Sequence, residues 1–292
     1  LVKFVLIILI ILFFMKKYYH LFRIKHYFKN LIILTPILFI EKKIDFLVIS
    51  NLLNIFLIFC LTASLVYIYN DIADIKSDKK HPKKRKLKPI ANGQISVKQG
   101  HFFLLILTLI ISINLFLNKD LVIIIVSYIF INYLYTNLFK KIIFLDIVVL
   151  SSNYFIRVLA GCIALNVPLS YWMGATIFSG AFFLSALKRK QELFLYGSKS
   201  RYVLKSYSVK GLKMLSNFAA MISIIFYTSY VISVNEKLLI TIPLVIYGII
   251  RYNHLSSKKS FTDSPVDEII NDKQNLVLIF LWVTSVIILR AN

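Results

Sequence analysis

Cysteine, proline and acidic residues are scarce in this chain of 292 residues. The two cysteines, Cys60 and Cys162, fall within apolar runs and lack the spacing of a metal site or of a disulfide pattern, which excludes a cysteine framework. The six prolines form no linker, so we expect a single domain over residues 15–292. Only 13 acidic residues oppose 35 basic ones, which gives a net charge of +22.

Apolar runs of nearly membrane-spanning length recur along the chain. Hydrophobic residues make up 59% of it and the mean hydropathy is +0.77, which predicts an all-α, polytopic membrane protein rather than a soluble one. We expect nine transmembrane helices, at 26–40, 44–69, 96–117, 121–138, 143–166, 169–188, 211–233, 238–251 and 274–290.

Residues 1–14 are apolar but shorter than a confident span, and a basic stretch begins at Met15. We expect an upstream extension of the true start. A short signal-like segment or an interfacial helix is the alternative that the sequence leaves open.

The basic residues indicate the orientation in the membrane. With nine spans, 28 of the 35 lysines and arginines fall on one side, which the positive-inside rule makes cytoplasmic. We therefore expect a multi-pass plasma-membrane protein with its N-terminus inside. The same loops face anionic headgroups and would suit phosphorylated substrates, so the charge does not require nucleic acid as a partner.

The first candidate site follows the second apolar run, where Asn70 precedes Asp71, Asp74 and Asp78. On one continuous helix these aspartates would lie within about 60° of one another. Converging carboxylates of this kind suit Mg²⁺, which completes its coordination with water and phosphate oxygens. The alternative is a solvated helix end with scattered charges.

A basic loop from Lys79 to Lys88 comes next, and residues 89–93 close it in a predicted turn. Side-chain charge and turn amides could hold a phosphate there, although such runs are more often only a topology signal. His81 stands before Pro82 and fits a phosphate or loop contact better than a metal site, because no second ligand is spaced to join it.

The third group begins at Tyr135 and Lys140 and continues into the fifth span as Asp146, Asn153 and Arg157. Helical spacing places these last three within about 40° of one another, on one stripe. An arginine inside the membrane is costly unless it faces a polar cavity or a partner. The alternative is a structural pairing of Asp and Arg with a neighbouring helix.

The fourth group ends the sixth span, where Lys188 and Glu192 are i, i+4 neighbours and Arg189 lies beside them. A helix C-terminus attracts cations in any case, so capping and topology are the simpler explanation of this group alone.

Together these motifs resemble the UbiA superfamily of intramembrane prenyltransferases, whose signature NDxxDxxxD is matched in full by Asn70, Asp71, Asp74 and Asp78. More narrowly, the chain resembles the decaprenyl-phosphate phosphoribosyltransferase branch. The likeness runs from Arg23 to Trp282, and its pieces are residues 23–30, the aspartate motif with His81 and Pro82, and residues 135–146, 157–161, 188–193 and 264–272.

The chain also departs from that pattern. Lys79 and Lys88 stand where the family commonly has arginine, and Tyr27 or Phe28 stands where it has tryptophan. Lysine cannot bind a phosphate in the bidentate manner of arginine. Because the chain has 28 lysines and 7 arginines, a general composition bias explains these two positions.

The resemblance implies a nine-helix bundle with a polar cavity facing the cytoplasm. It also implies Mg²⁺-dependent transfer of a phosphoribosyl group from phosphoribosyl diphosphate to a polyprenyl, decaprenyl-like phosphate, for cell-envelope glycan precursors. The implied catalytic residues are Asp71, Asp74, Asp78, Tyr135, Lys140, Asp146 and Arg157, and the three aspartates of this set are the implied metal ligands. The implied substrate-binding residues are Lys29, Asn30, Asn70, Lys79, His81, Lys83, Arg85, Lys88, Asn153, Lys188, Arg189 and Glu192.

Two other functions stay open at this point. One is a UbiA-type prenyltransferase that moves a polyprenyl group from its diphosphate to an aromatic or other small acceptor. Residues 135–141 lack the second aspartate-rich motif of such enzymes, and a reaction with three phosphate-bearing groups suits more cations and fewer carboxylates. The other is a non-enzymatic transporter or lipid-binding protein, for which matched broken helices would be expected and are not evident.

Overall fold

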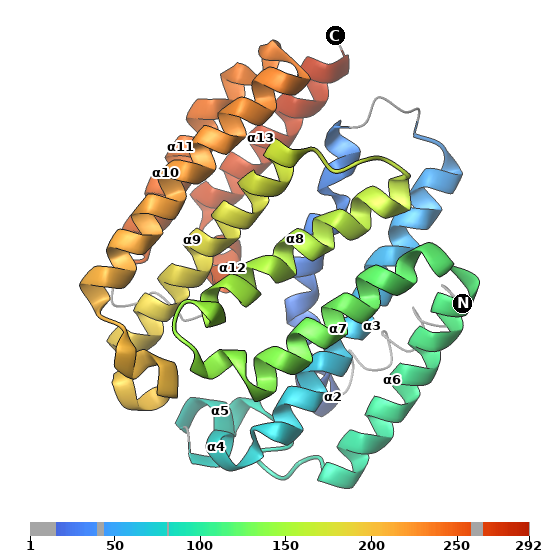
Figure 1. Cartoon of the computed structure of the whole chain (residues 1–292), viewed down its shortest axis with the longest axis vertical. Helices are drawn as coiled ribbons and strands as arrows, with labels where there is room; N and C mark the ends of the chain where they lie inside the picture. Colours follow the sequence, from blue (N-terminus) through green and yellow to red (C-terminus); the bar gives the residue numbers. More distant parts are fainter. Residues whose placement is uncertain (1–15, 40–43, 81, 258–264, 292) are drawn as a thin grey trace. The chain divides into compact units, whose positions relative to one another are not determined.

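The structure is a computed structural model that describes residues 16–39, 44–80, 82–257 and 265–291. Helices and connecting turns make up all of this described part, with no strand in it, which confirms the predicted all-α class (Figure 1). Residues 1–14 lie outside it.

The chain forms two compact units. That they belong to a single domain stays a prediction. Unit 1 comprises residues 1–34, 42–137 and 159–167, and unit 2 comprises 35–41, 138–158 and 168–292. The helices up to residue 137 are α2 (Lys16–Leu21), η1 (Ile24–Phe39), α3 (Phe46–Ala73), α4 (Ile75–Lys80), α5 (Pro82–Leu87), α6 (Val97–Leu117), η2 (Lys119–Leu121) and α7 (Val122–Asn137). They are followed by η3 (Phe139–Lys141), α8 (Leu145–Leu165), α9 (Tyr171–Tyr196), η4 (Ser198–Ser200), η5 (Tyr202–Ser206), α10 (Val209–Val234), η6 (Glu236–Thr241), α11 (Ile242–Leu255), α12 (Pro265–Asn271) and α13 (Lys273–Ala291).

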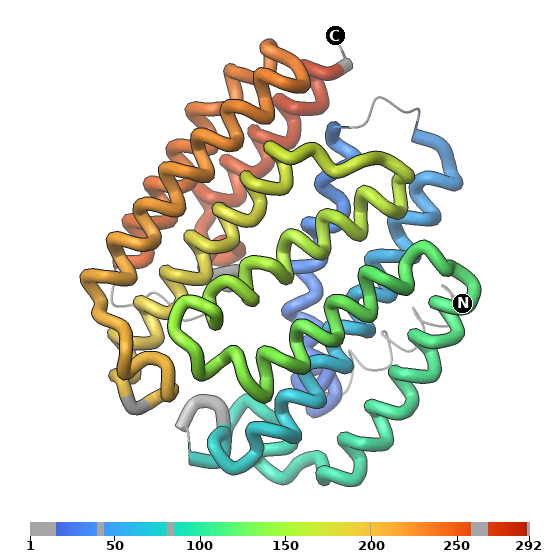
Figure 2. The backbone as a smooth tube through the Cα atoms, in the orientation of Figure 1, coloured from blue at the N-terminus to red at the C-terminus, as the bar shows by residue number. Residues whose placement is uncertain are grey.

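Helix α3 is the centre of unit 1 and packs against both α6 and α7. Gly100 lets α6 approach closely, because a Cβ there would lie 3.0 Å from the Cδ1 of Ile72. Deeper along the same pair of helices, the Asn114 amide donates to Asn54 Oδ1 at 2.9 Å, a polar contact of the kind that joins helices within membranes. Figure 2 follows the chain from α3 through the short α4 and α5 into α6.

Unit 2 is built on the long antiparallel pair α9 and α10, which lie side by side in Figure 1. Small residues sit at their contact, where Gly180 faces Ser223. Helices α11 and α13 pack together. The Tyr227 hydroxyl of α10 forms hydrogen bonds with the Thr241 hydroxyl at 2.6 Å and with the Trp282 indole nitrogen at 2.7 Å.

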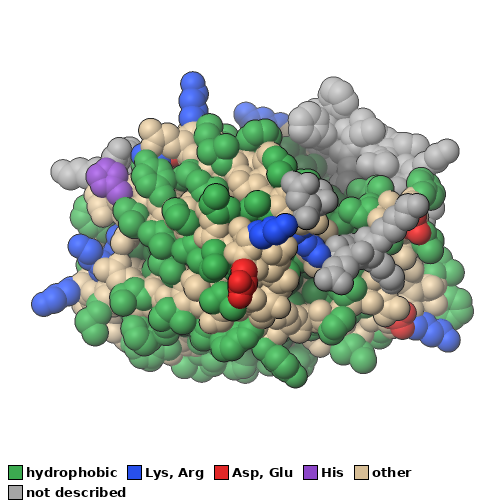
Figure 3. Space-filling model, turned by 90° about the horizontal axis from the view of Figure 1, so that it is seen from above, with side chains coloured by type: hydrophobic (Ala, Val, Ile, Leu, Met, Phe, Trp, Pro, Cys, Tyr) green, Lys and Arg blue, Asp and Glu red, His purple; other side chains and the backbone are tan. Residues whose placement is uncertain are grey.

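Seven helices of the described part are long and apolar enough to cross a membrane. They are Phe46–Ala73, Val97–Leu117, Lys119–Asn137, Leu145–Leu165, Val209–Val234, Glu236–Leu255 and Lys273–Arg290. Exposed apolar side chains lie along several of them, as a lipid-facing surface requires, and Figure 3 shows such side chains spread over one face of the molecule.

Nine spans were predicted, so two of the predicted spans are not among these seven. Predicted span 26–40 corresponds to η1, which is a 3₁₀ helix of 16 residues. Predicted span 169–188 corresponds to α9, which is 26 residues long but interrupts its apolar sequence with small and polar side chains such as Thr176, Ser179 and Ser185.

Candidate active site

The aspartate motif is divided between two helices rather than lying on one continuous helix. In the structure, α3 ends at Ala73 and α4 begins at Ile75. Asp74 caps α3 between them, with φ −94° and ψ 7°, and is half-buried. Asp71 and Asp78 are both buried. Within the described residues no group of three His, Cys, Asp or Glu side chains is placed to hold a metal.

Lys88 joins Asp71 and Asp78 instead. Its ammonium lies 2.8 Å from Asp71 Oδ1 and 2.5 Å from Asp78 Oδ2. Arg23 reaches the same Asp71 oxygen, with its Nη2 at 2.6 Å, and its guanidinium lies over the Tyr67 ring at 4.5 Å. These four side chains, Arg23, Asp71, Asp78 and Lys88, are called the Asp71 cluster below.

The Asp71 cluster has the donor atoms that a magnesium ion prefers. The second oxygen of Asp71 and the neighbouring amide oxygen of Asn70 are buried without a hydrogen-bond partner among the described residues. A buried acceptor that lacks a partner is costly, and a cation or water would satisfy both atoms. One or two carboxylates suffice for Mg²⁺ when substrate phosphates and water complete its coordination, so these residues fit the ion.

The described side chains of the basic loop are mostly exposed, and Lys79 and Arg85 both reach solvent. The turn after it uses its own amides, because Asn92 and Ile95 donate to the carbonyls of Lys88 and Pro89. A phosphate here would therefore be held by side chains. His81 and the side chain of Lys83 lie outside the described part.

Two predicted binding residues lie on η1. The Asn30 amide is buried and donates to the Cys60 sulfur at 3.3 Å, whereas Lys29 is half-buried. Asn30 is thus engaged in packing η1 against α3.

A second polar cluster lies in unit 2, where α8 and α9 meet the segment after α9. Asp146 is fully buried; its Oδ2 accepts from Arg189 Nε at 2.5 Å and its Oδ1 from the Tyr207 hydroxyl at 2.8 Å. Arg189 also donates to Glu192 Oε2 at 2.6 Å, and Arg201 Nε lies 3.0 Å from that oxygen. These five residues are called the Arg189 cluster below.

The pKa values of two members fix their charge states. Burial raises the pKa of the Glu192 carboxyl, but Arg201, Arg189 and Lys188 lower it by more, so its pKa lies well below the usual range. Burial and the Asp146 carboxylate raise the pKa of Tyr207. Glu192 is therefore ionised, and Tyr207 keeps the proton that it donates.

The residues of the predicted stripe on α8 have separate contacts. Asp146 pairs with Arg189 on α9, which is the structural alternative considered for this residue. Arg157 is buried and donates to the Asn153 carbonyl at 2.6 Å, near the Tyr154 ring. Tyr135, Lys140 and Lys188 are each half-buried.

Sequence reasoning assigned no role to Arg23, Arg201 or Tyr207. The arginines carried a usable signal, because this chain prefers lysine fourfold and yet keeps arginine at seven positions. Arginine is retained where a planar fork must hold a partner. Six of the seven make a hydrogen bond or ion pair within the described part of the chain. The seventh, Arg85, is exposed on α5. Tyr207 had no such signal.

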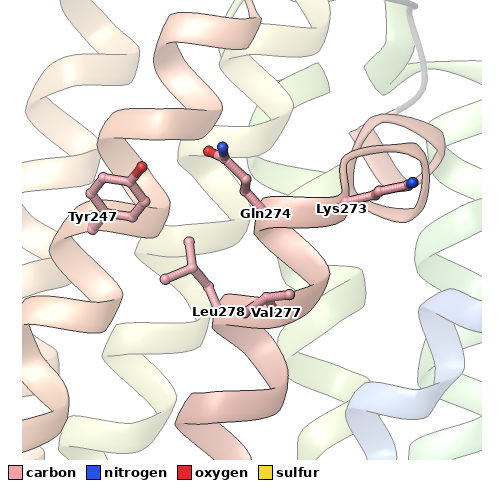
Figure 4. A pocket seen from close by; sticks show the side chains of 5 residues that line it. All are labelled: Tyr247, Lys273, Gln274, Val277 and Leu278. Atoms are coloured by element: carbon pink, nitrogen blue, oxygen red, sulfur yellow. The ribbon is translucent and has the colours of Figure 1, made fainter.

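A pocket between α11 and α13 lies apart from these residues. Tyr247, Lys273, Gln274, Val277 and Leu278 line it, and none of them was a predicted site residue. In Figure 4 the Lys273 amine points away from Tyr247 and Gln274, so the pocket lacks a focused charge.

The fold and the site define a polytopic helical membrane protein with buried carboxylates held among cations. The chain belongs to the UbiA prenyltransferase family, whose profile matches residues 30–262.

Among curated proteins, it is similar to the decaprenyl-phosphate phosphoribosyltransferase of Mycolicibacterium smegmatis, at 32% identity over 70% of this chain and 67% of that protein. It is also similar to the protein of that name from Corynebacterium glutamicum, at 34% identity over 56% of this chain and 51% of that one. The alignments thus span half to two thirds of these relatives.

Solved structures share the fold. A UbiA homolog from Archaeoglobus fulgidus bound to DMAPP and Mg²⁺ matches with a TM-score of 0.72, at 14% identity, over 94% of this chain and 98% of that one. The same homolog bound to Cd²⁺ matches with a TM-score of 0.68.

Proposed function

We propose that this protein transfers the 5-phosphoribosyl group of phosphoribosyl diphosphate to a polyprenyl phosphate. The bond between the anomeric carbon and the diphosphate oxygen breaks, and a phosphate oxygen of the lipid forms the new bond to that carbon. Diphosphate leaves with the bonding electrons. The lipid phosphate is already anionic near neutral pH, so no general base is needed. The names of the similar curated proteins support this substrate pair.

The Asp71 cluster is the observation that carries the proposal. Buried carboxylates with an acceptor oxygen to spare, beside Lys88 and Arg23, can hold a diphosphate together with its cation. Mg²⁺ bound there would neutralise the leaving group as it departs. Asp71 and Asp78, with Asp74 as a further candidate, would bind the ion, and Lys88 would bind a diphosphate oxygen. In unit 2, Lys188 and Arg189 would bind a remaining phosphate.

We also propose nine spans and a plasma-membrane location, with a polar cavity open to the cytoplasm. A 3₁₀ helix rises about 2.0 Å per residue, so the 16 residues of η1 extend over roughly 32 Å, close to the thickness of the hydrocarbon core. Helix α9, with 26 residues, is also long enough to cross. An odd number of spans keeps the basic loops on one side.

The orientation predicts which positions a membrane-impermeant thiol reagent reaches in intact cells. Ser77→Cys and Ser200→Cys should stay unlabelled from outside, because both loops are proposed to be cytoplasmic. Lys237→Cys, on the opposite side and exposed, is the matched positive control. Cys60 and Cys162 are buried and should give little background. Labelling of Ser77→Cys or Ser200→Cys before lysis would contradict the orientation.

Transfer is tested with membranes that contain the protein, Mg²⁺, polyprenyl phosphate and phosphoribosyl diphosphate labelled in the ribose. We expect label in the lipid fraction, dependent on both the protein and the polyprenyl phosphate. A parallel reaction with labelled polyprenyl diphosphate and an aromatic acceptor should give no product. The reverse pattern would support the aromatic prenyltransferase function instead.

A further inference from the structure

We propose that Arg201 and Tyr207 are positioning residues that hold the cationic end of α9 ready for a phosphate of the substrate. The inference rests on the proposed function for the identity of that substrate. Neither residue needs to touch the ligand, because each acts through a carboxylate of the Arg189 cluster.

The contacts of the Arg189 cluster form a closed path. It runs from the Tyr207 hydroxyl to Asp146, from Asp146 to Arg189, from Arg189 to Glu192 and from Glu192 to Arg201, with polar distances of 2.8, 2.5, 2.6 and 3.0 Å. The chain from residue 201 to residue 207 completes it through η5. Val203 and Leu204 are buried within η5 and anchor this segment. The path therefore ties α8 and α9 to one short stretch of chain.

Tyr207 also holds the turn that precedes α8. Phe144 has a φ of 64°, a left-handed conformation that a bulky residue rarely adopts. Its amide donates to the Tyr207 oxygen at 2.7 Å, and the two rings meet edge to face at 5.9 Å. One hydroxyl thus accepts from the turn and donates to Asp146, which links an unfavourable backbone conformation to the placement of that carboxylate.

The charges show what Arg201 contributes. Within the Arg189 cluster, Asp146 and Glu192 supply two negative charges and Arg189 and Arg201 supply two positive ones. Without Arg201, two carboxylates would face one arginine in the Arg189 cluster, so more of the charge of Lys188 and Lys190, on the same end of α9, would be taken up by them. Both oxygens of Asp146 already accept from protein donors, so Asp146 orients Arg189 and is poorly placed to hold a metal.

The test separates phosphate binding from folding by steady-state kinetics on the purified full chain in lipid nanodiscs. Tyr207→Phe removes the hydroxyl alone, and Arg201→Gln removes the charge. Each should raise the KM for the substrate whose phosphate binds at α9 by about 10-fold, the usual effect of one weakened charge-assisted contact. Arg201→Lys, which keeps the charge, should recover part of the loss. Tyr202→Phe and Lys205→Gln, on the same segment and exposed, should leave KM unchanged.

A purely structural role gives a different result, because loss of folded protein lowers the maximal rate and leaves KM as it was. That outcome for both Tyr207→Phe and Arg201→Gln would overturn the inference. If the wild-type protein transfers no phosphoribosyl group, the proposed function fails instead. Calorimetric binding of inorganic phosphate then decides the inference: weaker binding in both variants, but not in the two controls, supports it, and equal binding refutes it.

Discussion

Asp71→Asn should reduce phosphoribosyl transfer at least about 100-fold, the effect typical of removing one electrostatic group from a transition state. Asp71 is buried, contacts both Arg23 and Lys88, and has an acceptor oxygen without a described partner. Asparagine keeps the size of the side chain and removes the charge that a metal and two protein cations share. Initial rates at saturating Mg²⁺ measure the effect.

Two companion variants make this result specific. Asp120→Asn, at an exposed aspartate in η2, is the matched control and should stay within about 2-fold of wild type, as surface changes usually do. Asp74→Asn tests the residue at the helix break: a loss as large as that of Asp71→Asn would place it among the metal ligands. Thermal unfolding of each variant shows whether the protein is folded. A folded Asp71→Asn protein with a near wild-type rate would refute the metal assignment.

Arg189→Gln should lower the free energy of unfolding by about 3–5 kcal/mol, the range for removing one partner of a buried ion pair. Arg189 is the largest fully buried side chain among the described residues and holds two carboxylates at once. Without it, Asp146 and Glu192 stay buried with less positive charge nearby. Reversible denaturation in detergent micelles measures the change.

The matched control is Arg85→Gln, which removes an exposed arginine from α5 and should have little effect. A triple variant distinguishes the loss of the ion pairs of Arg189 from the cost of leaving two buried carboxylates without their partner. Adding Asp146→Asn and Glu192→Gln to Arg189→Gln removes the carboxylates that had lost their partner, so stability should recover in part. If the single variant is as stable as wild type, the Arg189 cluster does not contribute to stability as its burial implies.

Much of the fold was predictable because apolar runs of membrane-spanning length dominate the sequence. Seven of the nine predicted spans coincide with helices that meet the length and composition of a membrane span. The two exceptions have local causes. Span 26–40 winds as a 3₁₀ helix, and the polar and small residues of α9 reduce its apolar character. Hydrophobic periodicity does not distinguish a 3₁₀ helix from an α-helix, and it does not show which small side chains lie at a contact between helices.

The site was predictable in residue types but not in its contacts. The motif around Asp71 indicated a buried acidic site, yet nothing in its spacing signalled that the helix would end at Ala73. Asp146 and Arg189 were both singled out, but their partnership joins residues 43 positions apart. Tyr207 comes from a segment without periodicity. Such long-range pairs depend on how helices pack, which local patterns do not encode.

Lys88, together with Arg23, balances the charge of the two buried aspartates before any metal arrives. A divalent ion that enters between Asp71 and Asp78 must displace this ammonium, and the displaced lysine then needs a new negative partner. A diphosphate supplies one. Each ligand therefore removes the obstacle to the other, and by thermodynamic reciprocity the metal should tighten diphosphate binding as much as diphosphate tightens metal binding. The divalent ion alone and the diphosphate alone should each bind weakly, so the site should bind the two together.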